Sequence, residues 1–287
     1  MDLEKKVLAC VDQSHFADYV VDYSVWAAQR LAAPLELLHV LDRHPEIAAH
    51  ADHSGTLGLD AQAQLLTTLT EEDESRSKTA REVGRRFLAR LRSRAIDAGM
   101  ENTDVRQRHG ALADTLAEQE REVRLFVLGR RGEAAEHTQR DLGRSVEWVV
   151  RRLKRPILAV TEDFRPPQRA LLAFDGSPVT RRGVNLIAKS PLLKGIPVDI
   201  LVSGKGKGEG LRHLPWAQKT LEKAGYTVEA LQIPGDPERV IAETVQARAA
   251  DLLIMGAYGH SPLRSLIFGS KTSDLLRSAT LPTLLLR

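Results

Sequence analysis

The segment KKVLACVDQS at residues 5–14 indicates the fold, because it returns as QRALLAFDGS at residues 168–177. Each copy is a short apolar run that ends on an aspartate, Asp12 or Asp175, with a serine two residues further on. Short apolar runs that end in turn-forming residues are typical of buried β-strands. The repetition predicts that the chain contains two units of one fold.

Further landmarks follow each copy in the same order. An apolar run leads into Gly-x-x-Gly in VRLFVLGRRG (123–132) and in ADLLIMGAYG (250–259). A glycine and a serine come next, then a helical stretch and a last apolar run that is led by a proline, Pro156 or Pro282. Amphipathic stretches with apolar residues every three or four positions separate the strands. This alternation predicts an α/β fold with a parallel sheet that is covered on both faces.

We expect two tandem domains, at residues 1–162 and 168–287, joined by a stiff linker that contains Pro166 and Pro167. A length of 287 residues fits two domains. The first copy is the longer one, and its excess predicts a helical insertion at about 42–100 that is rich in charged residues. A solvated helix face is the favoured interpretation of the insertion, and an arm that docks a partner protein is the alternative.

Composition excludes several classes of protein. The only cysteine, Cys10, rules out an internal disulfide and disfavours a cysteine-based metal site. No apolar segment approaches the roughly 20 residues of a transmembrane helix, and the first residues lack the pattern of a secretory signal. We therefore expect a cytoplasmic protein with no membrane partner. A net charge of +3, with arginines interleaved among acids, argues against nucleic-acid binding.

The segment GAYGHSPLRSLIFGS (256–270) has the chemistry of a phosphate-binding loop. Ligands of open parallel sheets bind at the carboxyl ends of the strands, where Asp175 and Gly256 would lie. Gly256 and Gly259 let the backbone approach a ligand, and Ser270 opens a helix whose N-terminal amides attract phosphate oxygens. Ordinary turn formation and helix capping account for each piece taken singly, so both interpretations stay open at this point.

The spacing Gly-x2-Gly-x9-Gly-Ser, the aspartate after the first strand and the proline-led last strand together resemble the nucleotide-binding motif of the universal stress protein family. The resemblance covers both halves, so the chain is similar to a tandem universal stress protein. It implies two flavodoxin-like or adenine-nucleotide hydrolase-like domains, each with a five-stranded parallel sheet of order 3-2-1-4-5. It also implies that the ligand is ATP, commonly with a divalent ion such as Mg²⁺.

The resemblance assigns the nucleoside end of the ligand to five residues of the second half. Asp175 would contact the nucleoside itself. The backbone at the exit of the second strand, at Val202 or Ser203, would face the base. Met255 and Gly256 would line the sugar and the first phosphate.

The phosphate end falls on the glycine loop and the helix that follows it. Gly259, Gly269 and Ser270 would hold the phosphates. His260 lies between the first two of these positions, and Lys271 follows the last, so both belong to the candidate site. No protein ligand for a metal is expected.

The first half departs from the motif. Ten residues, rather than nine, separate Gly132 from Gly143, and Arg144 stands between that glycine and Ser145. Asp12 is retained. We therefore expect nucleotide binding mainly in the second half.

Binding rather than turnover is the predicted chemistry, because no general base is evident beside Ser270. We expect a nucleotide-sensitive regulator of the stress response that acts through a protein partner which the sequence does not identify. A slow ATPase or nucleotide hydrolase, and an interaction protein with an empty cleft, are the alternatives. In the family the last strands pair across a dimer, so we expect the two halves to form that pair within one chain, with a homodimer of chains left open.

Overall fold

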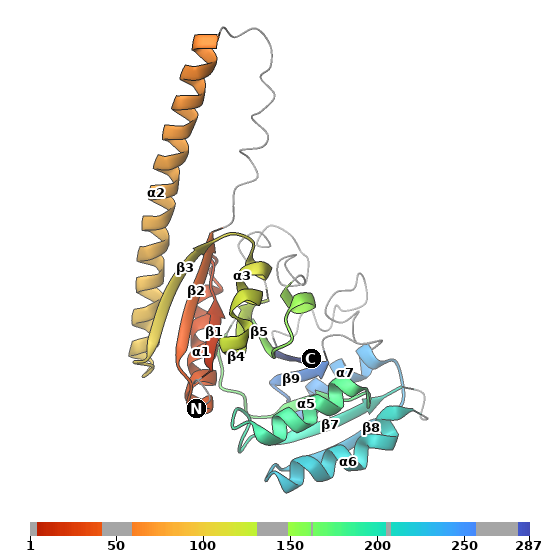
Figure 1. Ribbon diagram of the computed structural model, residues 1–287. Coiled ribbons are helices and arrows are strands. Elements are labelled where there is room, and N and C mark those ends of the chain that lie inside the picture. The colour runs from red at the N-terminus through yellow and green to blue at the C-terminus, as the bar shows by residue number, and fades with distance from the viewer. Residues whose placement is uncertain (1–4, 42–58, 131–148, 162, 205–207, 257–280) are drawn as a thin grey trace.

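A computed structural model describes residues 5–41, 59–130, 149–161, 163–204, 208–256 and 281–287 (Figure 1). Between residues 59 and 77 the description covers the helical backbone and not the side chains. Every structural statement below refers to these residues.

The described strands form a single ten-stranded sheet in the order β3-β2-β1-β4-β5-β10-β9-β6-β7-β8. Each half therefore has the strand order 3-2-1-4-5, and all pairs within a half are parallel. The prediction of an α/β fold with two such parallel units is confirmed. The strands of the first half are β1 (Lys6–Cys10), β2 (Leu35–Leu41), β3 (Thr103–His109), β4 (Val123–Gly129) and β5 (Ile157–Val160). Those of the second half are β6 (Ala170–Ala173), β7 (Val198–Ser203), β8 (Val228–Ile233), β9 (Leu252–Gly256) and β10 (Thr283–Leu286).

The two halves are joined by their last strands. β5 and β10 pair antiparallel, with Leu158 opposite Leu284. All four residues of β5 are buried, and so are the last three of β10. Because both strands are apolar on both faces, either one left as a free edge would expose backbone groups beside leucine and isoleucine side chains. Pairing the two edges removes this exposure.

Helices cover both faces of the sheet, each over a core that runs through both halves. One core lies beneath α1 (Ala17–Leu31), α2 (Leu59–Asp97), α5 (Pro178–Lys189) and α6 (Glu209–Lys223). The opposite core lies beneath α3 (Leu112–Gln119), which continues into the short 3-10 helix η2 (Glu120–Glu122), and beneath α7 (Pro237–Arg248). Residues alternate between the two cores along the strands, as in Val7, Leu8 and Ala9 of β1.

Helices α2 and α6 occupy equivalent places but differ in length. Two residues after the end of each helix comes a glycine with positive φ, Gly99 at +84° and Gly225 at +82°. The residue after that glycine donates a backbone hydrogen bond to the helix. Fifteen residues before these glycines lie Gly84 and Gly210, where an added Cβ atom would come within 3.2 Å of His39 in β2 and 2.9 Å of Val202 in β7. Helix α2 has 39 residues and α6 has 15. The excess is a continuation of α2 at its N-terminal end, which projects beyond the sheet (Figure 1).

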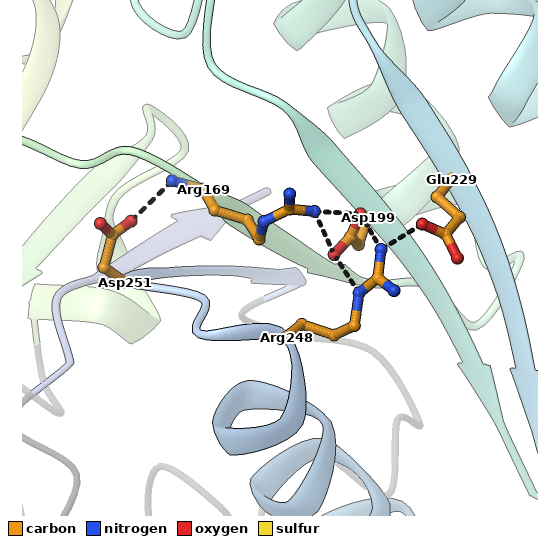
Figure 2. A network of polar contacts seen from close by, with 5 residues as sticks. All are labelled: Arg169, Asp199, Glu229, Arg248 and Asp251. Carbon is orange, nitrogen blue, oxygen red and sulfur yellow. Dashed lines mark hydrogen bonds and ion pairs between the residues drawn. The ribbon is translucent and has the colours of Figure 1, made fainter.

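A buried carboxylate organises the amino ends of the strands in the second half (Figure 2). Asp199 in β7 is 1% exposed and binds Arg169 Nη1 and Arg248 Nε at 3.1 and 3.0 Å. Arg248, at the end of α7, also pairs with Glu229 of β8. The Asp251 carboxylate accepts a hydrogen bond of 2.9 Å from the backbone nitrogen of Arg169, just before β6. The network thus ties α7 and the chain entering β6 to the interior of the sheet.

The first half repeats this arrangement with different residues. Glu36 in β2 stands opposite Leu8 of β1, as Asp199 stands opposite Leu171 of β6. The Glu36 carboxylate is buried and pairs with Lys6 Nζ at 3.0 Å and Arg106 Nη2 at 3.2 Å. A buried acid near the start of the second strand is therefore a shared feature of both halves that the sequence patterns did not reveal.

Asp199→Asn should lower the free energy of unfolding by about 2 kcal/mol, because two arginines lose the charge that compensates them. Urea denaturation followed by circular dichroism measures this loss. Glu229→Gln is the matched control, since the Glu229 side chain is 54% exposed and solvent screens its charge. Equal losses in the two variants would contradict the assignment of Asp199 as the centre of the network.

Candidate functional site

The candidate site lies at the carboxyl ends of β6 and β9 in the second half. Asp175 follows β6 by two residues and is half-buried. Its Oδ1 atom accepts hydrogen bonds from the Ser177 backbone nitrogen at 3.0 Å and from Thr180 Oγ1 at 2.8 Å. Its Oδ2 atom accepts none from any residue that the structure describes. The turn therefore fixes the orientation of the carboxylate and leaves one oxygen for an external hydrogen-bond donor.

The same turn starts helix α5. Ser177 is the N-cap, and its hydroxyl accepts a hydrogen bond from the Thr180 backbone nitrogen at 3.4 Å. Pro178 at the first helical position has no N–H to satisfy and a φ that suits the helix. Thr180 therefore serves both the cap and the aspartate, which connects the start of α5 to the position of the carboxylate.

The first turn of α6 closes over this aspartate turn. Gly176 has φ +74°, and a Cβ atom there would overlap the backbone of Glu209. A Cβ atom on Gly210 would lie 2.9 Å from Val202 Cγ1 and 3.4 Å from the Asp175 carbonyl group. Two glycines thus allow the aspartate turn, the exit of β7 and the start of α6 to meet at backbone distance.

The structure brings five of the predicted residues to this edge of the sheet. Val202 is buried against α6, and Ser203 ends β7 in a half-buried position. Met255 is 1% exposed, and its side chain belongs to the core beneath α7. Gly256 ends β9, and a Cβ atom there would lie 3.3 Å from Thr180 Cγ2 of α5. Together with Asp175, these residues line the carboxyl ends of β6, β7 and β9. Because the side chains of Met255 and Val202 are buried, these two residues present backbone groups to this edge.

The remaining predicted residues lie outside the described part of the chain. They are the phosphate-end set Gly259, His260, Gly269, Ser270 and Lys271.

The equivalent turn of the first half has a different construction. Asp12 Oδ1 accepts a hydrogen bond from the Ser14 backbone nitrogen at 3.2 Å, as in the second half. Gln13, which replaces the glycine, is not among the described residues with positive φ. Helix α1 begins five residues after Asp12, with Phe16 as an N-cap that makes no side-chain hydrogen bond, whereas α5 begins three residues after Asp175. The first half thus keeps the aspartate but not the tight turn that joins it to a capped helix.

Two residues of the site were missed by sequence reasoning. Thr180 orients Asp175, and the pattern Asp-Gly-Ser-Pro-x-Thr is the local signal that could have indicated it. Gly210 lets the first turn of α6 approach β7 closely. Its equivalence to Gly84 can be recognised only after the C-terminal ends of α2 and α6 are aligned. Neither residue belongs to the motif that suggested the site.

No group of three or more histidine, cysteine, aspartate or glutamate side chains suited to hold a metal ion occurs in the described ranges. The thiol of Cys10, at the end of β1, packs against the core beneath α3. Burial, and then the charges of Glu36 and Asp12, raise the pKa of this thiol well above its ordinary value. A raised pKa keeps the thiol neutral at physiological pH, which disfavours its reaction as a nucleophile.

The fold and the edge just described define a class: α/β proteins in which two doubly wound five-stranded units join edge to edge, each with an aspartate turn after its first strand. Residues 4–161 and 202–287 match the model of the universal stress protein family. A universal stress protein of Synechocystis sp. is 32% identical over 286 residues, which span 99% of this chain and 100% of that protein. The chain belongs to the universal stress protein family.

Other relatives agree with this assignment. A universal stress protein of Mycobacterium tuberculosis is 26% identical over 207 residues, which cover 62% of this chain and 63% of that protein. Among solved structures, that of a universal stress protein from Archaeoglobus fulgidus aligns over 99% of this chain and 97% of its own, with a TM-score of 0.66. At 16% identity this likeness concerns the fold. Of the helices in the described ranges, none combines the length and the apolar character needed to cross a membrane.

Gly176→Ala should destabilise the protein by about 2 kcal/mol more than Gly195→Ala. Both glycines have similar positive φ, +74° and +79°, but a Cβ atom on Gly195 has nothing within 4 Å. The difference between the variants therefore isolates the contact with the start of α6. Urea denaturation measures both, and equal stabilities would show that α6 does not close over the turn.

Cys10 should react with 5,5′-dithiobis(2-nitrobenzoic acid) at pH 8 about 100-fold more slowly in the folded protein than in guanidinium chloride. The raised pKa leaves little thiolate in the folded state, and unfolding restores the ordinary value. Absorbance at 412 nm follows the release of the thiol product. Equally fast reaction of the folded chain would contradict the raised pKa of this thiol.

Proposed function

We propose that this universal stress protein binds ATP in its second half and acts as a nucleotide-sensitive regulator of the stress response. The observation that carries the proposal is the Asp175 turn. A carboxylate that is oriented by Ser177 and Thr180 and keeps one oxygen without an internal partner suits a hydroxyl or amino group of a nucleoside. Its place at the carboxyl ends of the strands is where ligands of such sheets bind.

We assign the base, sugar and phosphates of the ligand to the same edge of the sheet. The backbone at Val202 and Ser203 lies at the exit of β7, next to the aspartate turn, and suits the base. Met255 and Gly256 end β9 beside α5 and suit the sugar and first phosphate. By the sequence motif, we assign the phosphates to Gly259, Gly269 and Ser270, with His260 and Lys271 beside them.

The difference between the halves supports one nucleotide per chain. The second half combines the glycine turn, the capped helix and the complete glycine-loop spacing. The first half has Gln13 in the turn, an uncapped α1 and altered spacing in the loop. The turn that would place the nucleoside and the loop that would place the phosphates therefore both differ between the halves.

The proposed ligand includes Mg²⁺, which ATP phosphates supply with oxygen ligands of the kind that this ion prefers. The protein would act in the cytoplasm, and a change of nucleotide would alter its contact with a regulatory protein partner or a second copy of the chain. No residue with the role of a general base follows from the described geometry at Asp175, so the proposal is for binding and not for efficient hydrolysis.

Asp175→Ala should weaken MgATP binding at least about tenfold, because the nucleoside loses a charged hydrogen-bond acceptor. Asp12→Ala is the matched control, since it removes the corresponding turn hydrogen bond in the first half. Isothermal titration calorimetry should give one site per chain for the wild type and for Asp12→Ala, and circular dichroism checks that both variants fold. Equal loss of affinity in the two variants would contradict the assignment to the second half.

Nucleotide released from freshly purified, denatured protein provides an independent count. One equivalent of adenine nucleotide per chain is expected, and two would refute the asymmetry. If no nucleotide is released and calorimetry shows no binding, the alternative of an interaction protein with an empty cleft is favoured. Phosphate release that survives Gly269→Asp would identify a contaminating ATPase, whereas release that disappears with this variant would favour the slow hydrolase.

A further inference from the structure

A pocket of about 650 Å³ lies at the junction of the two halves, away from the candidate nucleotide site. Its lining includes the residues just before β1 and β5 of the first half and the last turn of α5, whereas Asp175 stands before the first turn of α5. The first half contributes Leu31 and Leu125, and the second half contributes Leu284 of β10 and the last turn of α5. This volume is typical of sites for small organic ligands.

Among the described residues, the lining contains four cations and no acidic side chain. Lys5, Arg124 and Arg155 come from the first half, and Lys189 comes from the end of α5. Lys5, Arg124 and Arg155 are half-buried, whereas Lys189 is exposed at the opening. None of the ion pairs found among the described residues involves any of them. Four cations facing one cavity without a carboxylate create a positive potential that favours an anion.

Part of this positive charge offsets the negative C-terminal ends of the helix dipoles of α1 and α5. Arg124 Nη1 does so directly, because it donates a hydrogen bond to the carbonyl oxygen of Leu31 at 3.3 Å. This role does not extend to Lys5 and Arg155, which lie before strands and for which the described structure shows no side-chain hydrogen bond. Their charges are therefore available to a ligand in the pocket.

The rest of the lining is largely apolar. Leu31, Leu125 and Leu284 are buried and form the inner surface, and Leu186 of α5 is 40% exposed at the opening. Asn185 and Ser190 add neutral hydrogen-bonding groups from the same side. An apolar interior with cations around it matches a molecule that has a hydrocarbon or aromatic body and an anionic group.

We propose that this junction pocket binds a small amphipathic organic anion, with Arg155 and Lys189 facing its anionic group and the leucines of both halves facing its apolar body. Such a ligand contacts both halves at once, so its binding stabilises the β5–β10 junction. The site is independent of the nucleotide site at Asp175.

Fluorescence titration with 8-anilinonaphthalene-1-sulfonate, an aromatic sulfonate, tests the proposal on the full chain. The double variant Arg155→Gln/Lys189→Gln should bind this probe about tenfold more weakly than the wild type. Arg182→Gln/Lys219→Gln is the control, because it removes the same charge from positions outside the lining. Circular dichroism checks that both proteins fold, and wild-type affinity is expected for the control.

Two competition measurements distinguish binding in this pocket from binding of the probe elsewhere on the protein. Dodecyl phosphate, below its micelle concentration, should displace the probe, and dodecyltrimethylammonium, with the same chain and opposite charge, should not. Saturating MgATP should leave probe binding unchanged. The proposal is overturned by unchanged affinity in the pocket variant, by an equal loss in the control, by displacement with the cation, or by displacement with MgATP, which would place the probe in the nucleotide site.

Discussion

The antiparallel pairing of β5 with β10 is the interaction on which the rest of the structure depends. These two apolar strands end their halves, and each would be an unprotected edge if the halves separated. Their pairing produces one continuous sheet, and the two cores then run uninterrupted from the first half into the second. Contacts around the junction add to it: Tyr23 meets Phe164 edge to face at 4.8 Å, and Arg30 of α1 donates to the carbonyl oxygen of Leu192. The junction also creates the pocket that is lined by cations from both halves.

The two halves show how one fold can keep its framework while its potential binding edge changes. Both have a buried acid near the start of the second strand, at Glu36 and Asp199, and both close the equivalent helix with a positive-φ glycine. These features support the sheet and are found in each half. At the carboxyl edge, by contrast, Gly176 permits a turn that Gln13 does not adopt, and of the helices α1 and α5 the second alone has a side-chain cap. Framework and edge are physically separate, so one can change without unfolding the other.

Much of the fold followed from local patterns. The repeated apolar runs indicated the strands, the three-to-four spacing indicated the helices, and the repeated order indicated two parallel units, because these patterns depend on neighbours in the sequence. The long helix α2 was anticipated, but not that its last turns match α6, since this match depends on where both helices meet the sheet. Asp175 and Gly256 were brought to one edge as the order of strands requires. Thr180 and Gly210 escaped notice because their importance comes from contacts with other elements.

The sequence by itself determined the repeat, the α/β class, the family and the aspartate and glycine positions, because each of these is written in residue type and spacing. Only the tertiary structure decided which oxygen of Asp175 is occupied by its own turn, that the Met255 side chain belongs to the core, and that Lys5, Arg124, Arg155 and Lys189 face one cavity. These facts depend on the packing of segments that are far apart in the chain. Burial and orientation, unlike periodicity, are set by all the neighbours of a side chain at once.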